Sequence, residues 1–267
     1  MNLVKAHALG NDFLLLDGRD APRGADAGSL ARLVCSRHRG IGADGLIVYD
    51  PDERGASMRL LNADGSPSEI SGNGIRCLAA WIALGGRLAP GAVVEIATDA
   101  GAKPLELLDR TGARFTFRAA MGQPEEIARV ELEAAGAAVD AITLRVGNPQ
   151  CVVLGEVSQQ RLRTIAAALA VHPHFPEGTN VELATVDAPD CVRMLIWERG
   201  VGPTEASGTG ACAAAVAAIR YGGAAADVHV VSPGGAQRVE WRDDGLYLTG
   251  WAEVVAEARW IGSTEVP

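Results

Sequence analysis

The sequence predicts an α/β (α+β) protein of two pseudo-symmetric halves, each with a mixed or antiparallel sheet wrapped around a central apolar helix. The active site is expected in the cleft between the halves. Two observations predict this fold. Short motifs recur in the same order at a nearly constant spacing, and each half contains a helical segment that is apolar on every face. A helix that is apolar all round is a buried helix. With 267 residues, 48% of them hydrophobic, the chain is long enough for two ordinary domains.

The repeat is a duplication of a half-chain, with offsets of 136 or 137 residues between matching motifs. Gly-polar turns recur in any α/β protein, but four matches in the same order are hard to attribute to chance. We therefore expect the matched residues to overlie one another in space. The matches are Asn11 with Asn148, Asp44 with Asn180, Asn62 with Glu198, and Ser71-Gly72-Asn73-Gly74 with Ser207-Gly208-Thr209-Gly210.

Each half is expected to contain short β-branched strands, a helix, more strands and a second helix. The first helices are predicted over residues 29–39 and 158–171, because Ser29 and Ser158 are good N-caps. The second, buried helices follow each Ser-Gly-x-Gly motif. A Gly-Gln-Pro-Glu-Glu segment at residues 122–126 interrupts the strand pattern, which predicts domains at 1–122 and 123–267. Whether the last ten or so residues pack back on the N-terminal half is left open.

Composition excludes several classes of function. The net charge of −9 and the pI near 5.1 argue against nucleic acid or an anionic membrane surface as the main partner. The cysteines are odd in number and form no CxxC pair, so neither a disulfide framework nor a metal site is expected. The N-terminus lacks a signal-peptide pattern and no 18-residue apolar run occurs, which predicts a cytoplasmic protein.

The duplicated Ser-Gly-x-Gly motif indicates where a ligand would bind. An isolated copy is merely an N-cap and a turn. Two copies would present two helix N-termini, whose free amides and positive dipole ends bind carboxylates. One side chain from each loop would face opposite sides of a bound carbon. That arrangement suits removal of a proton from one face and its return on the other.

The chain resembles the diaminopimelate epimerase family along nearly its whole length. The resemblance rests on an ordered series of motifs, which makes the match of fold highly specific. The motifs are Gly10-Asn11-Asp12-Phe13, Arg37-His38-Arg39-Gly40-Ile41-Gly42-Ala43-Asp44-Gly45, Asn62-Ala63-Asp64-Gly65-Ser66, Gly72-Asn73-Gly74-Ile75-Arg76-Cys77, Gly147-Asn148-Pro149, Asn180-Val181-Glu182, Glu198-Arg199-Gly200 and Gly208-Thr209-Gly210-Ala211-Cys212.

The resemblance implies a cofactor-free, two-base epimerisation of LL- to meso-diaminopimelate, a step of lysine and peptidoglycan biosynthesis, and it suggests a homodimer. The family's two catalytic cysteines fall at Ser71 and Ser207, with Glu198 as a further catalytic candidate. Amides of Gly72, Asn73, Gly208 and Thr209 would hold the reacting carboxylate. The other implied substrate contacts are Asn11, Asp44, Asn62, Asn148, Asn180, Glu198 and Arg199. Arg199 suits the distal carboxylate, because a guanidinium binds carboxylate in a fork.

The two serines depart from the family pattern. A serine hydroxyl is a poor base unless a neighbouring group activates it, whereas a thiol at a helix N-terminus titrates in the working range. Cys77 and Cys212 are expected inside the helices and cannot take over. Either the serines were introduced to trap a substrate complex, or the protein has diverged naturally. Gln150 replaces the family's usual histidine, and Pro203 and Glu205 also depart from it, which favours divergence.

Three functions remain open from the sequence. The first is an epimerase of a diaminopimelate-like amino acid with impaired or altered chemistry. The second is a one-base isomerase of the same fold, which would use Glu205 or Glu198. The third is a non-catalytic protein that has kept the amino-acid pocket. All three take a small amino acid as ligand, and none calls for a cofactor.

Overall fold

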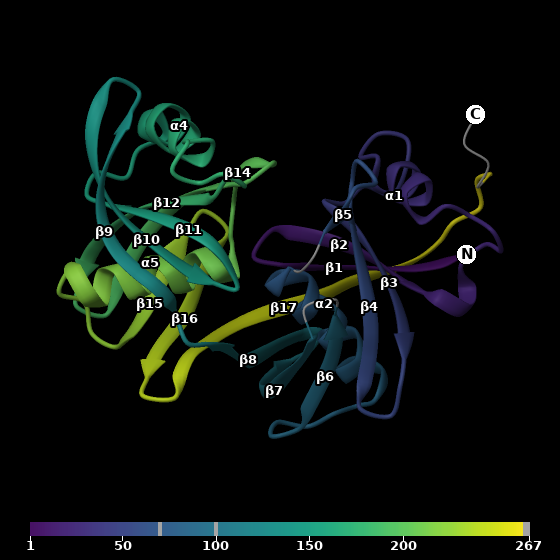
Figure 1. Ribbon diagram of the computed structural model, residues 1–267. Helices are drawn as coiled ribbons and strands as arrows, with labels where there is room; N and C mark the ends of the chain where they lie inside the picture. Colours follow the sequence, from purple (N-terminus) through teal and green to yellow (C-terminus); the bar gives the residue numbers. More distant parts are fainter. Residues whose placement is uncertain (69–70, 99–100, 264–267) are drawn as a thin grey trace. The chain divides into compact units, whose positions relative to one another are not determined.

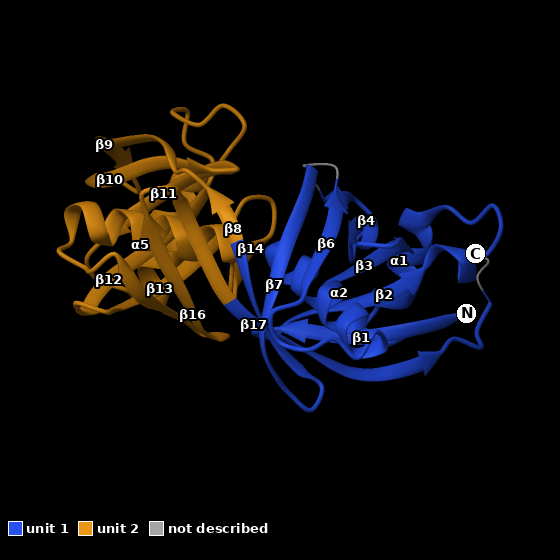
Figure 2. Cartoon of the chain, turned by 90° about the horizontal axis from the view of Figure 1, so that it is seen from below, with its two compact units in different colours: residues 1–119, 250–267 blue, residues 120–249 orange. Residues whose placement is uncertain are grey.

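The computed structural model describes residues 1–68, 71–98 and 101–263, and the chain divides into two compact units. Unit 1 comprises residues 1–119 and 250–267, and unit 2 comprises residues 120–249 (Figure 2). Two long strands run from one unit into the other: β8 (Arg114–Gly122) and β17 (Gly245–Arg259). Of the final ten residues, 264–267 lie outside the described part of the chain.

Unit 1 is an eight-stranded sheet that closes on itself. The strands pair in the order β1, β2, β3, β4, β6, β7, β8 and the second part of β17, which returns to β1. The short strand β5 adds to the free side of β4. The remaining strands are β1 (Asn2–Ala8), β2 (Asn11–Asp17), β3 (Gly45–Pro51), β4 (Gly55–Asn62), β5 (Pro67–Ser68), β6 (Val93–Thr98) and β7 (Gly101–Thr111), with a 3-10 turn η1 (Gly18–Asp20) after β2.

Unit 2 repeats this plan. Its strands pair in the order β9, β10, β11, β12, β13, β15, β16 and the first part of β17, with the short strand β14 on β13. The elements are β9 (Glu125–Ala134), β10 (Ala137–Val146), β11 (Asn148–Leu154), β12 (Asn180–Ala188), β13 (Cys191–Glu198), β14 (Gly202–Thr204), β15 (Asp227–Ser232) and β16 (Gly235–Arg242).

The two units also agree in which neighbouring strands are parallel and which are antiparallel. β2 pairs with β3 in parallel, as β11 does with β12, and β4 pairs with β6 in parallel, as β13 does with β15. The intervening pairs are antiparallel in both units. The two units therefore share one order and sense of strand pairing, as a duplication requires, and the strand-rich mixed α/β fold is confirmed.

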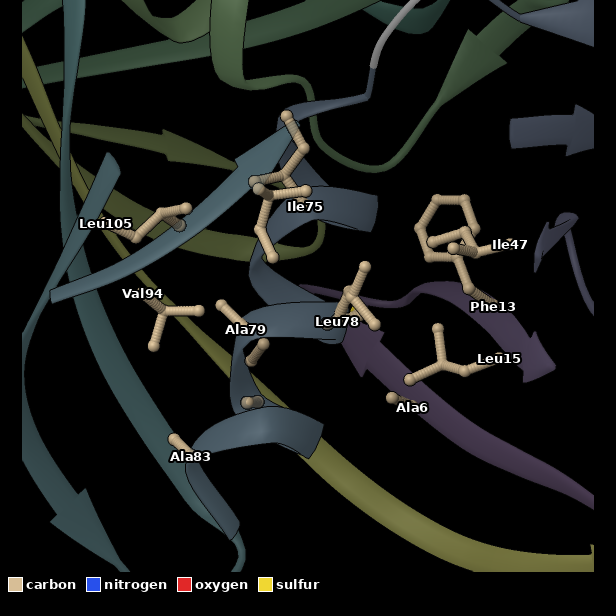
Figure 3. Packing of buried hydrophobic residues seen from close by; sticks show 14 of the residues in the cluster. Ala6, Phe13, Leu15, Ile47, Ile75, Leu78, Ala79, Ala83, Val94 and Leu105 are labelled. Carbon is tan, nitrogen blue, oxygen red and sulfur yellow. The ribbon is translucent and has the colours of Figure 1, made fainter. Parts of the chain in front are cut away.

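Each sheet surrounds one apolar helix, α2 (Gly72–Gly85) in unit 1 and α5 (Gly208–Tyr221) in unit 2. Figure 3 shows α2 against side chains from the surrounding strands, including Phe13 and Ile47. The helix contributes buried residues on all sides, among them Ile75, Leu78 and Ala79. α5 is more alanine-rich and is buried from Ala211 to Ala218. The space inside each curved sheet is therefore filled by a helix and its packed side chains.

The register of the strands corrects one expected match. Gly45 of β3 pairs with Asn62 of β4, whereas Val181 of β12 pairs with Trp197 of β13. Continuing the second ladder by one residue sets Asn180 opposite Glu198. If Asn62 corresponds to Glu198, then Asn180 corresponds to Gly45, and the predicted match of Asn180 with Asp44 is wrong by one residue. The segments that lead into β3 and β12 differ in length, which shifts the repeat locally.

The first helix of unit 1 also differs from the prediction. α1 spans Ala27–Cys35, and its N-cap is Asp26, which accepts a hydrogen bond from the Ser29 amide at 2.8 Å. Ser29 was therefore the wrong cap. In unit 2 the Ser158 cap is confirmed, because its hydroxyl accepts from the Arg161 amide. The helical run that follows consists of α3 (Gln159–Arg161), a π-helical turn η2 (Leu162–Ala166) and α4 (Ala167–Ala170). No helix in the described ranges is long and apolar enough to cross a membrane.

Glycine at position 210 is required by the packing around the start of α5. A Cβ there would lie 2.6 Å from Ile196 Cδ1 and 2.8 Å from Glu182 Oε1, inside a buried region. We expect Gly210→Ala to lower the free energy of unfolding by about 1–3 kcal/mol through overpacking. Gly85 is the matched control, because a Cβ at this helical position meets nothing within 4 Å. Gly85→Ala should raise stability by about 0.5–1 kcal/mol. Denaturant unfolding of both variants checks this, and equal effects would contradict the packing argument.

Candidate functional site: two capped helix N-termini

Ser71 caps the N-terminus of α2. Its backbone is extended and its Oγ accepts a hydrogen bond from the Gly74 amide at 3.1 Å. The amides of the first turn of a helix have no partner within the helix, and they carry the positive end of its dipole. The side chain of Ser71 is half-buried, so its hydroxyl lies beside these amides and within reach of a ligand. This end of α2 is suited to bind a carboxylate.

A row of hydrogen bonds leads from α2 to the predicted contacts at the start of β2 and just before β3. Asn73 is buried and donates from Nδ2 to Asn11 Oδ1 at 3.2 Å. Asn11 in turn donates from Nδ2 to Asp44 Oδ2 at 2.8 Å. Arg76, also buried, donates to Asn73 Oδ1. Three of the residues predicted from the sequence are therefore brought together, and Asn11 is held in a fixed orientation by its neighbours.

Asp12 anchors this row through an ion-pair network that sequence reasoning missed. Arg37 contacts both carboxyl oxygens of Asp12, at 3.2 and 2.8 Å, and also contacts Asp44 Oδ1 at 2.7 Å. Lys5 pairs with Asp12 from the neighbouring strand β1. Partial burial by itself would raise the pKa of Asp12, but hydrogen bonds from Arg37 and Lys5 lower it. Asp44 therefore acts here as a support for Asn11, and its predicted contact with substrate stays a prediction.

Asn62 lies at the end of β4, paired with Gly45. Its Nδ2 donates to Ser66 Oγ at 3.0 Å, and its backbone amide donates to the Ser66 carbonyl at 2.9 Å. The side chain is partly exposed at the end of β4, which pairs with β3, and β3 in turn pairs with β2, the strand that begins at Asn11. This position is consistent with the predicted substrate contact.

Ser207 repeats in unit 2 what Ser71 does in unit 1. Its backbone is extended, and its Oγ accepts from the Gly210 amide at 3.2 Å. Thr209 Oγ1 lies 3.5 Å from the same hydroxyl oxygen. Gln237, a buried residue of β16, donates from Nε2 to the Ser207 carbonyl at 3.2 Å and so fixes the loop from behind. Ser207 is 8% exposed, so this hydroxyl is more enclosed than that of Ser71.

The strands beside α5 supply the other predicted contacts. Asn180 Oδ1 accepts from the Arg199 amide at 2.8 Å, which fixes the chain immediately after Glu198. The Arg199 guanidinium donates to the Glu177 carbonyl at 3.1 Å and is otherwise exposed, as a carboxylate-binding group needs to be. On β11, Gln150 donates from Nε2 to Asn148 Oδ1 at 2.6 Å. Asn148, Asn180 and Glu198 therefore all lie at the strand ends near the N-terminus of α5.

The remaining residues named from the sequence are placed as follows. Cys77 and Cys212 lie inside α2 and α5 with no exposed surface, as predicted, and burial raises the pKa of the Cys77 thiol. Pro203 and Glu205 are exposed in the segment before Ser207, and the Glu205 carbonyl accepts from the Gly234 amide at 2.9 Å. Within residues 1–68, 71–98 and 101–263, no three His, Cys, Asp or Glu side chains are grouped to hold a metal ion.

A model of the diaminopimelate epimerase family matches residues 3–127 and 142–255. The chain belongs to the diaminopimelate epimerase family. A relative from Desulforudis audaxviator, named diaminopimelate epimerase, is 41% identical over 98% of this chain and 99% of its own length. A second, from Microcystis aeruginosa, carries the same name and is 39% identical over 95% of this chain and 96% of its own. The curated relatives are named as epimerases, and structural neighbours include an epimerase and a racemase, all of which are isomerases.

Solved structures agree on the fold. A predicted epimerase from Pseudomonas aeruginosa matches with a TM-score of 0.74 and 16% identity, over 98% of this chain and 99% of that one. A probable proline racemase from Agrobacterium radiobacter, with bound carbonate, matches with a TM-score of 0.71 and 17% identity, over 97% and 92% of the two chains. These neighbours share the arrangement of strands and helices described above.

Proposed function

We propose that this protein is an amino-acid epimerase that acts on diaminopimelate, interconverting the LL and meso forms, and that its activity is impaired or altered by serine at both thiol positions. The observation that carries the proposal is the pair of equivalent helix N-termini, each capped by the serine that precedes a Gly-x-Gly. Each such half-site would supply one of the two groups that the reaction needs. Family membership supports the substrate, and lysine and peptidoglycan biosynthesis would be its metabolic context.

The residues divide naturally into binding and chemistry. Amides of Gly72 and Asn73 in unit 1, and of Gly208 and Thr209 in unit 2, would hold the reacting carboxylate. Arg199 would bind the distal carboxylate in a fork. Asn11, Asn62, Asn148, Asn180 and Glu198 would complete the contacts to the ligand's amino and carboxyl groups. Each of these side chains lies at the N-terminal end of α2 or α5, or on a strand end beside it.

The chemistry requires one group to take the α-proton and another to supply one. The Ser71 and Ser207 hydroxyl oxygens accept hydrogen bonds from helix amides. Each hydroxyl can still donate its own hydrogen to a ligand. A hydroxyl is a weak base, so it orients the ligand better than it accepts the proton. Glu198, at the end of β13, is one ionisable side chain that would act in its place, and Glu205, in the segment before Ser207, is the other candidate. We therefore expect binding to be retained and turnover to be slow.

Further parts of the proposal rest on family likeness. We propose that no cofactor is used, that the protein acts in the cytoplasm, and that it forms a homodimer. The chain has two lysines, Lys5 and Lys103, and Lys5 is held by Asp12 and the Gly42 carbonyl. A Schiff base to a cofactor would need a lysine that is free to react, so Lys5 is unsuited to that role.

A one-base isomerase is the second candidate, and the position of Glu198 favours it. With serine at both thiol positions, a single carboxylate would exchange the α-proton on one face only. Deuterium from D2O would then enter with retention of configuration. A non-catalytic binding protein would show no exchange at all, and an epimerase would show exchange with inversion.

Arg199 provides the test of the substrate. Lysine is diaminopimelate without the distal carboxylate, so the unchanged protein should bind meso-diaminopimelate more tightly than L-lysine. A hydrogen bond to a charged group contributes about 1.5–3 kcal/mol, which is roughly 10–150-fold in Kd. We expect Arg199→Met to remove this preference. Arg193→Met is the control, because Arg193 is an exposed arginine of β13, the strand that ends just before Arg199, and it is paired with Asp187. Calorimetric titration of both ligands measures the effect.

Two results would contradict the proposal. Equal affinity of the unchanged protein for the two ligands would show that the distal carboxylate is not recognised. A preference that survives in Arg199→Met and disappears in Arg193→Met would place the carboxylate site at Arg193 instead.

A further inference from the structure

Glu182 is a buried carboxyl group directly behind the α5 half-site. It lies in β12, has no exposed surface, and neither carboxyl oxygen has a hydrogen-bond partner. Its Oε1 lies 2.8 Å from the position that a Cβ on Gly210 would occupy, so the carboxyl packs against the first turn of α5. An ionised carboxylate in such a place is costly unless it is paired.

The duplication provides an internal comparison for this position. In unit 1 the side chains that approach Gly74 most closely include Ile47 and Phe13. Pairing registers place Ile47 where unit 2 has Glu182, and Phe13 where it has Gln150. Ile47 and Phe13 both face α2, as Figure 3 shows. The fold therefore accepts apolar side chains at these points, and the polar pair in unit 2 is not needed to build the barrel.

Burial and a neighbouring carboxylate favour the neutral form of Glu182, and they outweigh the opposing effect of its backbone amide. Burial raises the pKa of Glu182 most, and repulsion by Glu198 of β13 raises it further. Its own backbone amide lowers the pKa and offsets only part of this rise. From β11 come Gln150, whose buried Oε1 lacks a partner, and Cys151, whose thiol pKa is raised by burial and by Glu182. The near end of α5 adds Ser207, Thr209 and the buried Cys212, while its arginine, Arg220, is in the last turn.

The other face of β12 adds no charge to this group. Residues alternate between the faces of a strand, and Val181 and Leu183 belong to the core that η2 and α4 cover. Ala184, two residues beyond Glu182, belongs instead to the core around α5. Among the described residues, the charged group that acts on Glu182 is therefore the Glu198 carboxylate, and no cation contributes to the shift of its pKa.

We propose that Glu182 is a positioning residue that holds a proton beside Glu198 and thereby keeps the N-terminus of α5 able to bind a substrate carboxylate. The inference rests on the proposed function. If Glu182 ionised, its negative charge would occupy the positive end of the helix that the ligand's carboxylate needs. Ligand binding should therefore weaken as Glu182 loses its proton, although Glu182 itself does not touch the ligand.

The experiment compares the unchanged protein with Glu182→Gln, which is neutral at every pH and nearly the same shape. The Kd for meso-diaminopimelate is measured by calorimetry from pH 6 to 9.5, and the ratio of the two values is followed. The ligand's own amines also titrate in this range, but they affect both Kd values equally and therefore cancel in the ratio. Glu133→Gln, an exposed glutamate of β9, is the control. In parallel, the carboxyl resonances of 13C-labelled glutamate are titrated, and the Glu182 signal is the one absent from Glu182→Gln.

We expect a Kd ratio near one at pH 6 that rises toward about tenfold per pH unit once Glu182 begins to ionise. The Glu182 signal should stay in its protonated form at pH values at which exposed glutamates have ionised. A ratio that is constant with pH, or a Glu182 signal that titrates like an exposed glutamate, would overturn the inference. If no variant binds diaminopimelate at any pH, the proposed substrate fails, while the carboxyl titration still decides whether Glu182 holds its proton. Should Glu182→Gln not fold, Glu182→Ile carries the residue that unit 1 has at this position.

Discussion

Replacing Ser71 and Ser207 together by cysteine should raise the rate of α-proton exchange in diaminopimelate by about 10²–10⁴-fold. Both side chains already lie at helix N-termini and cap them, so a thiol in either place would lie beside the same amides. A helix N-terminus lowers the pKa of a thiol toward the working range, which a hydroxyl cannot reach. The measurement is deuterium uptake at the α-carbon from D2O, followed by NMR, with the stereochemistry of the product determined at the same time.

The single variants are the matched controls. Ser71→Cys and Ser207→Cys should each remain close to the unchanged protein in the epimerisation rate, because two groups that act as a unit do not contribute additively. Cys77 and Cys212 are fully buried and should take no part. Brisk exchange by the unchanged protein would contradict the assignment of the two serine positions. It would direct attention to Glu198, and its stereochemistry would separate one-base from two-base chemistry.

The duplication could be predicted because short sequence motifs recur in both halves in the same order. Ser71 and Ser207 cap their helices as the repeat predicted, and the strand order agrees in both units. The match of Asn180 with Asp44 was wrong because register depends on how strands pair across the sheet, which a constant offset does not describe. Similarly, Ser29 was mistaken for a cap because Asp26 has the same capping ability and lies one turn earlier.

The supporting contacts of the site were not predictable in the same way. Lys5, Asp12 and Arg37 are brought together by the pairing of β1 with β2 and by the loop after α1, so their network depends on tertiary structure. Glu182 belongs to the Asn180-Val181-Glu182 motif, but its significance comes from the face of the strand on which its side chain lies. Alternation places it with Asn180 toward α5, and comparison with Ile47 in the other half would have marked it as a polar residue in an apolar position.

The protonation of Glu182 also has a consequence for stability that does not involve any ligand. Burial and Glu198 raise the pKa of this carboxyl in the folded state above the value of an exposed glutamate. Between those two pKa values the unfolded chain has released the proton and the folded chain still holds it. Stability contributed by this group is therefore complete at acid pH and is lost as pH rises above the unfolded pKa. The loss amounts to about 1.4 kcal/mol per pH unit until the folded group also ionises.

Glu182→Gln removes this loss, because glutamine does not titrate. The difference in free energy of unfolding, variant minus unchanged protein, should be near zero or slightly negative at pH 4 and should increase at about 1.4 kcal/mol per pH unit above it. Denaturant unfolding at pH 4, 5, 6 and 7 measures this slope, and every other titrating group cancels because it is common to both proteins. Glu133→Gln should give a flat difference. A flat difference for Glu182→Gln as well would mean that Glu182 ionises in the folded protein as readily as in the unfolded chain, which its unpaired burial between Glu198 and Gly210 makes physically costly.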